Sequence, residues 1–199
     1  MGTIIMKRSL GLCALIGVLA GGCATSDSAS KYFRDAGRNS NVYVAPGHSA
    51  IRKVAVMPFK AETELIGSAV SDQVVTELLH TGRYELIERS QIARVLGEQE
   101  LALAGLSAGR AAEVGAMLGA DGVVIGTVAE YGKVAVRGKT YASVAVACRL
   151  IDTKTGKVVW SADVAGRAEN SAIPLAQYSR NMIHDMIAGV FKQMARVKK

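Results

Sequence analysis

The chain has 199 residues and a formal net charge of +7, from 24 Lys and Arg against 17 Asp and Glu. Its basic side chains are scattered apart from a basic C-terminus, whereas a nucleic-acid surface gathers basic and aromatic residues on one face, so we expect no nucleic-acid partner. The modest positive charge suits solubility or contact with anionic lipid headgroups.

Residues 1–22 have the layout of a lipoprotein signal peptide. Lys7 and Arg8 precede an uncharged apolar run, residues 10–20, that is too short to span a membrane comfortably. The run ends in small residues that lead into Cys23, in a pattern that resembles a bacterial lipobox. We therefore expect Cys23 to be lipidated, so that acyl chains anchor the mature protein to a membrane without a transmembrane helix. An ordinary cleaved signal with an incidental cysteine is the alternative.

Two details of this region concern targeting and the start of translation. Ala24, and not aspartate, follows Cys23, and by the sorting rule for such lipoproteins this implies the outer membrane of a Gram-negative cell, with the protein on its periplasmic face. The start residue is Met1 or Met6. Met6 would be a natural start, because it stands directly before the basic pair Lys7 and Arg8.

Residues 23–50 are predicted to be a lipidated, flexible tether. They are rich in Ser, Asn, Asp, Arg and Gly and show no apolar periodicity. A few apolar residues, Tyr32, Phe33 and residues 42–44, interrupt this composition. These residues dock on a neighbouring subunit or pack on their own domain, and the sequence does not separate the two alternatives.

Residues 51–199 are enough for one domain with a single core. Its first half predicts strands at 53–59, 84–87 and 121–128, each rich in β-branched or apolar residues. Between them, apolar residues at helical spacing predict three helices. These apolar residues are Val70, Val74, Val75, Leu78 and Leu79 in the first helix, Ile92, Val95 and Leu96 in the second, where the polar Gln99 continues the same face, and Ala111, Val114 and Leu118 in the third. The order is βαβαβ, typical of an α/β layer.

The second half predicts strands at 130–136 and 140–151, joined around residues 137–139, and a returning strand at 157–164 with Trp160 as its anchor. The last element is an amphipathic helix, whose apolar stripe runs from Leu175 to Met194. We expect an α/β (α+β) fold with a mixed sheet of about five strands and helices packed against it.

Three stretches resemble the curli-secretion lipoprotein family (CsgG-like): Val-Ala-Val-Met-Pro-Phe at 54–59, residues 71–90 with Leu-Ile-Glu-Arg, and Leu-Gly-Ala-Asp leading into a glycine-ended strand at 118–128. The resemblance covers roughly residues 52–194. It implies that the family-motif residues have structural roles, and these are Pro58, Phe59, Glu88, Arg89, Asp121 and Gly126. It also implies that the segment before the domain helps to join subunits.

The chain departs from the curli channel, whose subunits each contribute two long β-hairpins to a pore. A spanning strand needs about 9–11 residues with an apolar row that faces lipid. Residues 130–151 offer one hairpin that carries Lys133, Arg137, Lys139 and Arg149, and residues 157–164 are too short to begin a second. We therefore expect a short member of the family that lacks the long transmembrane hairpins and forms a periplasmic ring or collar.

No pattern in the sequence indicates an enzyme, a cofactor or a metal site. Residues 132–140 differ from a phosphate-binding loop, because five residues separate the glycines and a strand is predicted to follow. His48, His80 and His184 lie far apart in the sequence. Cys148 falls on the inward row of its strand with Val144, Val146 and Leu150, as expected of a small buried side chain.

The leading hypothesis is a non-enzymatic, outer-membrane-anchored subunit of an envelope secretion or assembly complex, which binds copies of itself and other envelope proteins. The alternative is a lipoprotein that activates a peptidoglycan synthase, similar to lipoproteins of related fold. A hydrolase or a protein that binds a small ligand is a third possibility, and it requires a polar pocket. The mass of the oligomer separates the first hypothesis from the others.

Overall fold

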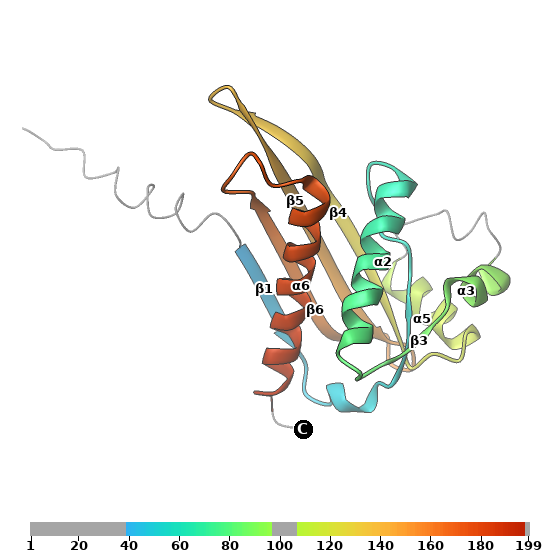
Figure 1. Ribbon diagram of the computed structural model, residues 1–199. Helices are drawn as coiled ribbons and strands as arrows, with labels where there is room; N and C mark the ends of the chain where they lie inside the picture. The colour runs from blue at the N-terminus through green and yellow to red at the C-terminus, as the bar shows by residue number, and fades with distance from the viewer. Residues whose placement is uncertain (1–38, 97–106, 198–199) are drawn as a thin grey trace, which may run out of the picture.

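The computed structural model describes residues 39–96 and 107–197, and Figure 1 shows their arrangement. The strands are β1 (Asn39–Val44), β2 (Lys53–Val56), β3 (Glu85–Ile87), β4 (Gly122–Val136), β5 (Lys139–Asp152) and β6 (Val158–Arg167). The helices are the 3-10 turn η1 (His48–Ala50), α2 (Glu64–His80), α3 (Arg89–Leu96), α5 (Ala108–Met117) and α6 (Leu175–Met194).

All the described strands join one mixed sheet, in the order β1-β6-β5-β4-β2-β3. The pairs β2–β3 and β2–β4 are parallel, and the other three pairs are antiparallel. The parallel pairs follow from the helices between these strands, because a parallel partner needs a crossover connection. The predicted α/β class, with its βαβαβ start and C-terminal helix, is confirmed.

Strand β1 was not predicted, and its presence shows that the predicted tether boundary at residue 50 is wrong. Asn39–Val44 pairs along its whole length with β6, so the folded domain begins at least at Asn39. Val44 is buried in the main core, and Val42 packs against that core. Val42 and Val44 therefore pack on their own domain, whereas Tyr43 is 56% exposed. Residues 23–38 of the predicted tether, which include Cys23, lie outside the described residues.

Strand β4 is longer than predicted, because the two strands expected at 121–128 and 130–136 are one. The pairing with β5 shifts by one residue between Val128 and Glu130, as at a β-bulge. The bulge accommodates Ala129 without ending the strand. The β4–β5 hairpin turns at Arg137 and Gly138, both with positive φ, and in Figure 1 its tip projects beyond the rest of the sheet.

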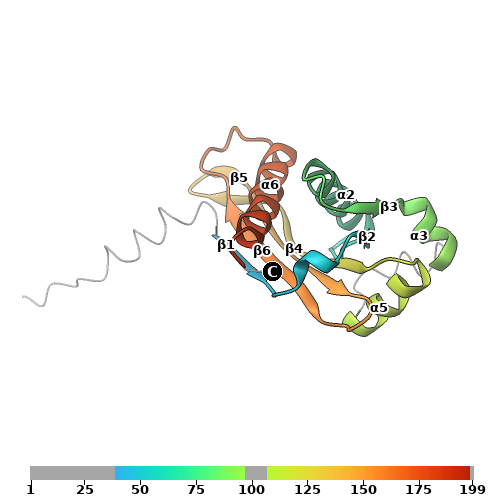
Figure 2. The ribbon, with the colours of Figure 1, turned by 90° about the horizontal axis from the view of Figure 1, so that it is seen from below.

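The helices lie on both faces of the sheet, as the view in Figure 2 shows. Helices α2 and α6 cover one face and enclose the larger core, in which Trp160 is fully buried. Helices α3 and α5 cover the end of the other face near β2 and β4, around Ala55, Val123 and Ile151. Two predicted core positions are wrong, since Leu79 is 55% and Val95 38% exposed.

Polar contacts join α2 to α6 above this core. Ser179 Oγ donates to Gln73 Oε1 at 2.9 Å, and His184 Nδ1 lies 2.9 Å from Glu77 Oε2. His184 therefore contributes to helix packing. None of the helices in the described ranges combines the length and apolar character needed to cross a membrane.

Candidate functional site at the end of strand β2

The chain order around β2 creates a topological switch point. Strand β2 lies between β3 and β4 in the sheet. The connection from β2 to β3 runs through α2 on one face of the sheet. The connection from β3 to β4 runs through α3 and α5 on the opposite face. In open α/β sheets, ligands bind in the crevice at the carboxyl ends of the strands where such connections diverge. In this chain, that crevice lies between the end of β2 and β4.

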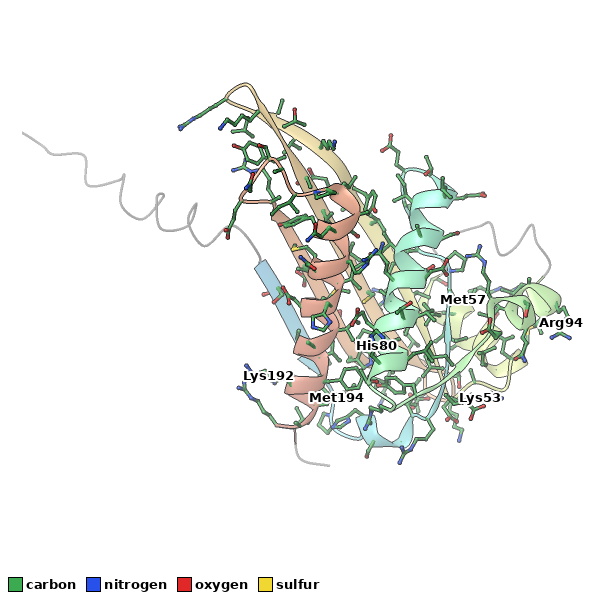
Figure 3. The ribbon with its side chains drawn as sticks, in the orientation of Figure 1. Lys53, Met57, His80, Arg94, Lys192 and Met194 are labelled. Carbon is green, nitrogen blue, oxygen red and sulfur yellow. The ribbon has the colours of Figure 1, made fainter. Side chains whose placement is uncertain are left out.

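A pocket of about 220 Å³ occupies this position. The chain that leaves β2 forms one wall, and β4, β5 and β6 form the floor. The lining residues are Met57, Pro58, Lys60, Ile125, Gly126, Thr127, Ala147, Cys148, Arg149 and Ser161. In Figure 3, Met57 marks this region, between α2 and α3 in that view.

The pairing of the strands places the polar lining residues on one face of the sheet. Arg149 on β5 is opposite both Ile125 on β4 and Ser161 on β6. Lys60 forms an isolated parallel bridge with Thr127, and so lies beside β4. Directly opposed residues point to the same face. This face, beyond the area that α3 and α5 cover, leaves Lys60, Thr127 and Arg149 exposed.

The side-chain groups at the pocket are hydrogen-bond donors without a catalytic base. Lys60 and Arg149 bring positive charge, and Thr127 and Ser161 bring hydroxyl groups. The Cys148 side chain belongs to the core under α6, and burial raises the pKa of its thiol to about 12, so it stays protonated. Within residues 39–96 and 107–197, no group of three His, Cys, Asp or Glu side chains could hold a metal ion.

Three family-motif residues meet at this pocket. Pro58 and Gly126 line it, and Phe59, fully buried, lies beneath Gly126. A Cβ atom on Gly126 would lie 2.5–2.7 Å from three atoms of the Phe59 ring. The backbone of Phe59 is equally confined, because its N–H donates to Gly67 O at 3.4 Å. Gly126 and Gly67 thus leave room for Phe59, which holds the segment that forms the pocket wall in place.

Asp121 holds the opposite end of β2. Its Oδ2 accepts hydrogen bonds from the backbone N–H groups of Arg52 (3.1 Å) and Lys53 (2.9 Å). The bond from Lys53 is the main reason that the pKa of the Asp121 carboxyl is lower than its usual value. Asp121 therefore aligns β2 with β4 and does not reach the pocket.

Glu88 and Arg89 lie at the start of α3 and have local contacts. The carbonyl of Glu88 accepts from the N–H groups of Gln91 and Ile92, which closes the first turn. Arg89 Nη2 donates to Ser68 Oγ at 3.2 Å and links α3 to α2. The structure therefore brings Pro58, Phe59 and Gly126 together, and keeps the other described motif residues apart from them.

None of the four polar residues of the pocket was predicted from the sequence as a site residue. Lys60 and Thr127 each directly follow a motif residue, Phe59 and Gly126, and this adjacency was an available signal. Arg149 and Ser161 carry no local signal, because only the pairing of β5 with β6 brings them to the same place.

Comparisons with known proteins agree with this fold. A model of the protein family described as "Curli production assembly/transport component CsgG" matches residues 46–193. The matched range includes all three stretches that carry the resemblance to curli-secretion lipoproteins. A search of curated proteins by sequence gives no match.

Several solved structures are similar at low sequence identity, which shows a shared fold. The PelC dodecamer from Paraburkholderia phytofirmans has a TM-score of 0.58 and 19% identity, over 77% of this chain and 97% of the PelC chain. A variant of that dodecamer gives the same TM-score and coverage at 21% identity. Lipoprotein GNA1162 from Neisseria meningitidis has a TM-score of 0.51 and 19% identity, over 73% of this chain and 99% of that chain.

Proposed function

The chain belongs to the CsgG family, and we propose on this basis that it is a self-assembling subunit of an envelope secretion or assembly complex. In this proposal, copies of the chain form a ring or collar on the periplasmic face of the outer membrane. The subunit is non-enzymatic, and lipid on Cys23 anchors it.

The similarity to PelC carries the proposal of self-assembly. PelC is a dodecamer, and the matched region is 97% of its chain. Almost nothing in that chain lies outside the fold that the two proteins share, so a domain of this fold is sufficient to build a dodecamer. The present chain contains a domain of the same fold.

The edges of the sheet support a contact between successive copies. Rings form when one surface of a subunit binds a different surface of the next. Strand β1 is at one edge of the sheet, and β3 is at the other. The sequence of β1, Asn39–Val44, has no charged residue and no proline, which are the features that commonly protect an edge strand from pairing. Strand β1 is therefore a candidate contact with a neighbouring copy.

Anchoring through Cys23 places the domain close to the membrane. Fifteen residues, 24–38, separate Cys23 from β1. A chain of this length reaches at most about 50 Å. This short connection favours a complex assembled at the membrane surface over a partner deep in the cell wall. GNA1162, which shares the fold, is also a lipoprotein.

The experiment is electron microscopy of the lipidated protein, extracted from membranes in mild detergent and negatively stained. Closed rings of uniform diameter are the expected result. A matched Cys23→Ala variant, made without lipid, tests whether the anchor is needed for membrane association. Particles of single-subunit size in both preparations would contradict self-assembly and direct attention to a peptidoglycan synthase as partner.

A further inference from the structure

We propose that the pocket between β2 and β4 binds a phosphoryl group, either free or carried by a lipid headgroup. The site lies within one subunit, so the proposal is independent of self-assembly. Its polar side chains are Lys60, Thr127, Arg149 and Ser161.

The position of the pocket in the sheet favours a ligand site. It lies at the point where the connections from β2 and β3 diverge to opposite faces, and this is where open α/β sheets place their ligands. The chain leaves the sheet after Met57, whose N–H donates to Val124 O at 2.9 Å, and rejoins it at Lys60, whose N–H donates to Gly126 O at 2.9 Å. Pro58 and Phe59 between these bonds leave the gap that forms the pocket.

The polar side chains of the pocket lie on one face of the sheet. Lys60 and Arg149 approach the pocket from opposite sides, since β4 separates them. Two strand spacings and an offset of two residues along β4 put their backbones roughly 12 Å apart, a distance that two long side chains can close when they extend over β4. Thr127 and Ser161 add hydroxyl donors on the same face. An arginine fork, an ammonium group and hydroxyls together match the oxygens of a phosphoryl group.

No acidic side chain is among the described residues that line the pocket. Within the part of the chain that the structure describes, neither Lys60 nor Arg149 forms an ion pair. The acidic residue on the neighbouring row of β6, Asp163, accepts from Asn41 Nδ2 at 3.0 Å and does not line the pocket. The two cations are therefore available for an external anion.

The size of the pocket limits the ligand. Its volume of about 220 Å³ is below the range of about 300–1,000 Å³ that encloses drug-sized ligands. A phosphoryl group with a short substituent fits this space, whereas a whole nucleotide exceeds it. The remaining lining, Met57, Pro58 and Ile125, is apolar and suits a small carbon substituent.

The test is isothermal titration calorimetry of the mature, lipidated chain in a non-ionic detergent at constant ionic strength. One arm uses inorganic phosphate, and the other uses phosphatidylglycerol carried in micelles of the same detergent. Lys60→Ala and Arg149→Ala should each weaken binding about tenfold or more, because each removes charge-assisted hydrogen bonds. Both residues are exposed, so neither substitution disturbs the core.

A matched control distinguishes binding at the pocket from a general effect of the positive charge of the protein. Lys139→Ala removes the same charge at the hairpin, outside the pocket, and should leave the affinity unchanged. Binding of phosphate alone supports a free oxyanion, and binding of the lipid supports a headgroup. No saturation up to about 10 mM in either arm would overturn the proposal, as would equal weakening by Lys139→Ala.

Discussion

Replacing Gly126 by alanine should destabilise the protein through a single contact. The added Cβ would lie 2.5, 2.6 and 2.7 Å from three atoms of the Phe59 ring, whereas an ordinary contact begins at about 3.4 Å. The ring must therefore move by nearly 1 Å, yet Phe59 is fully buried and its backbone is held by Gly67. Overpacking of this kind costs about 1–3 kcal/mol.

A second glycine of the same strand provides the control. A Cβ on Gly132 meets nothing within 4 Å. Alanine in a strand is favoured over glycine by about 0.5–1 kcal/mol, because glycine loses more backbone entropy on folding. We therefore expect Gly132→Ala to be neutral or slightly stabilising, and Gly126→Ala to lower the free energy of unfolding by about 1–2 kcal/mol. Urea unfolding of the mature chain measures both.

A double-mutant cycle identifies the cause. Phe59→Leu removes ring atoms near residue 126, so it should be less destabilising in the Gly126→Ala background than in the natural chain. Residues in contact commonly show coupling energies of about 0.5–3 kcal/mol. If the two substitutions are additive, or if Gly126→Ala is as stable as Gly132→Ala, the close approach of Phe59 to Gly126 is not what requires glycine.

Three further predictions follow from individual contacts. Gly67→Ala should destabilise α2, because the added Cβ would overlap the carbonyl of Phe59. Gly109→Ala, on the open surface of α5, should instead stabilise the protein by up to about 1 kcal/mol. Thermal unfolding measures both variants. Asp121→Asn should lower stability at pH 7. The difference in stability should vanish as the pH falls below 3.8, the usual pKa of an aspartate carboxyl, and then through the lowered pKa of Asp121. Urea unfolding at several pH values tests this. Cys148, with its pKa near 12, should resist iodoacetamide at pH 8 until urea unfolds the protein; rapid labelling of the native chain would contradict its burial.

Local sequence patterns were sufficient to predict the bounds of β5 and α6. The stripe of α6 and the alternation in β5 predicted those elements almost to the residue, because both bury one continuous face. The same reasoning failed at Leu79 and Val95. Each stands next to a buried leucine, Leu78 or Leu96, but adjacent positions on a helix differ in direction by about 100°, so its side chain faces away from the core.

Longer-range features could not be predicted in this way. Strand β1 is held by β6, more than a hundred residues later, and half of its own sequence is polar. The continuity of β4 depends on a bulge at residue 129, which looks like an interruption in the alternation. The pocket combines residues from 57 to 161, and only the order of the strands brings them together.

The mass of the lipidated protein in mild detergent, measured by light scattering over a wide range of concentration, tests self-assembly most directly. A soluble chain that starts at Ala24 and keeps β1 is the comparison. We predict a large oligomer of fixed mass for the lipidated form, as expected for a closed ring. A monomer mass for both forms at every concentration would contradict the proposed function.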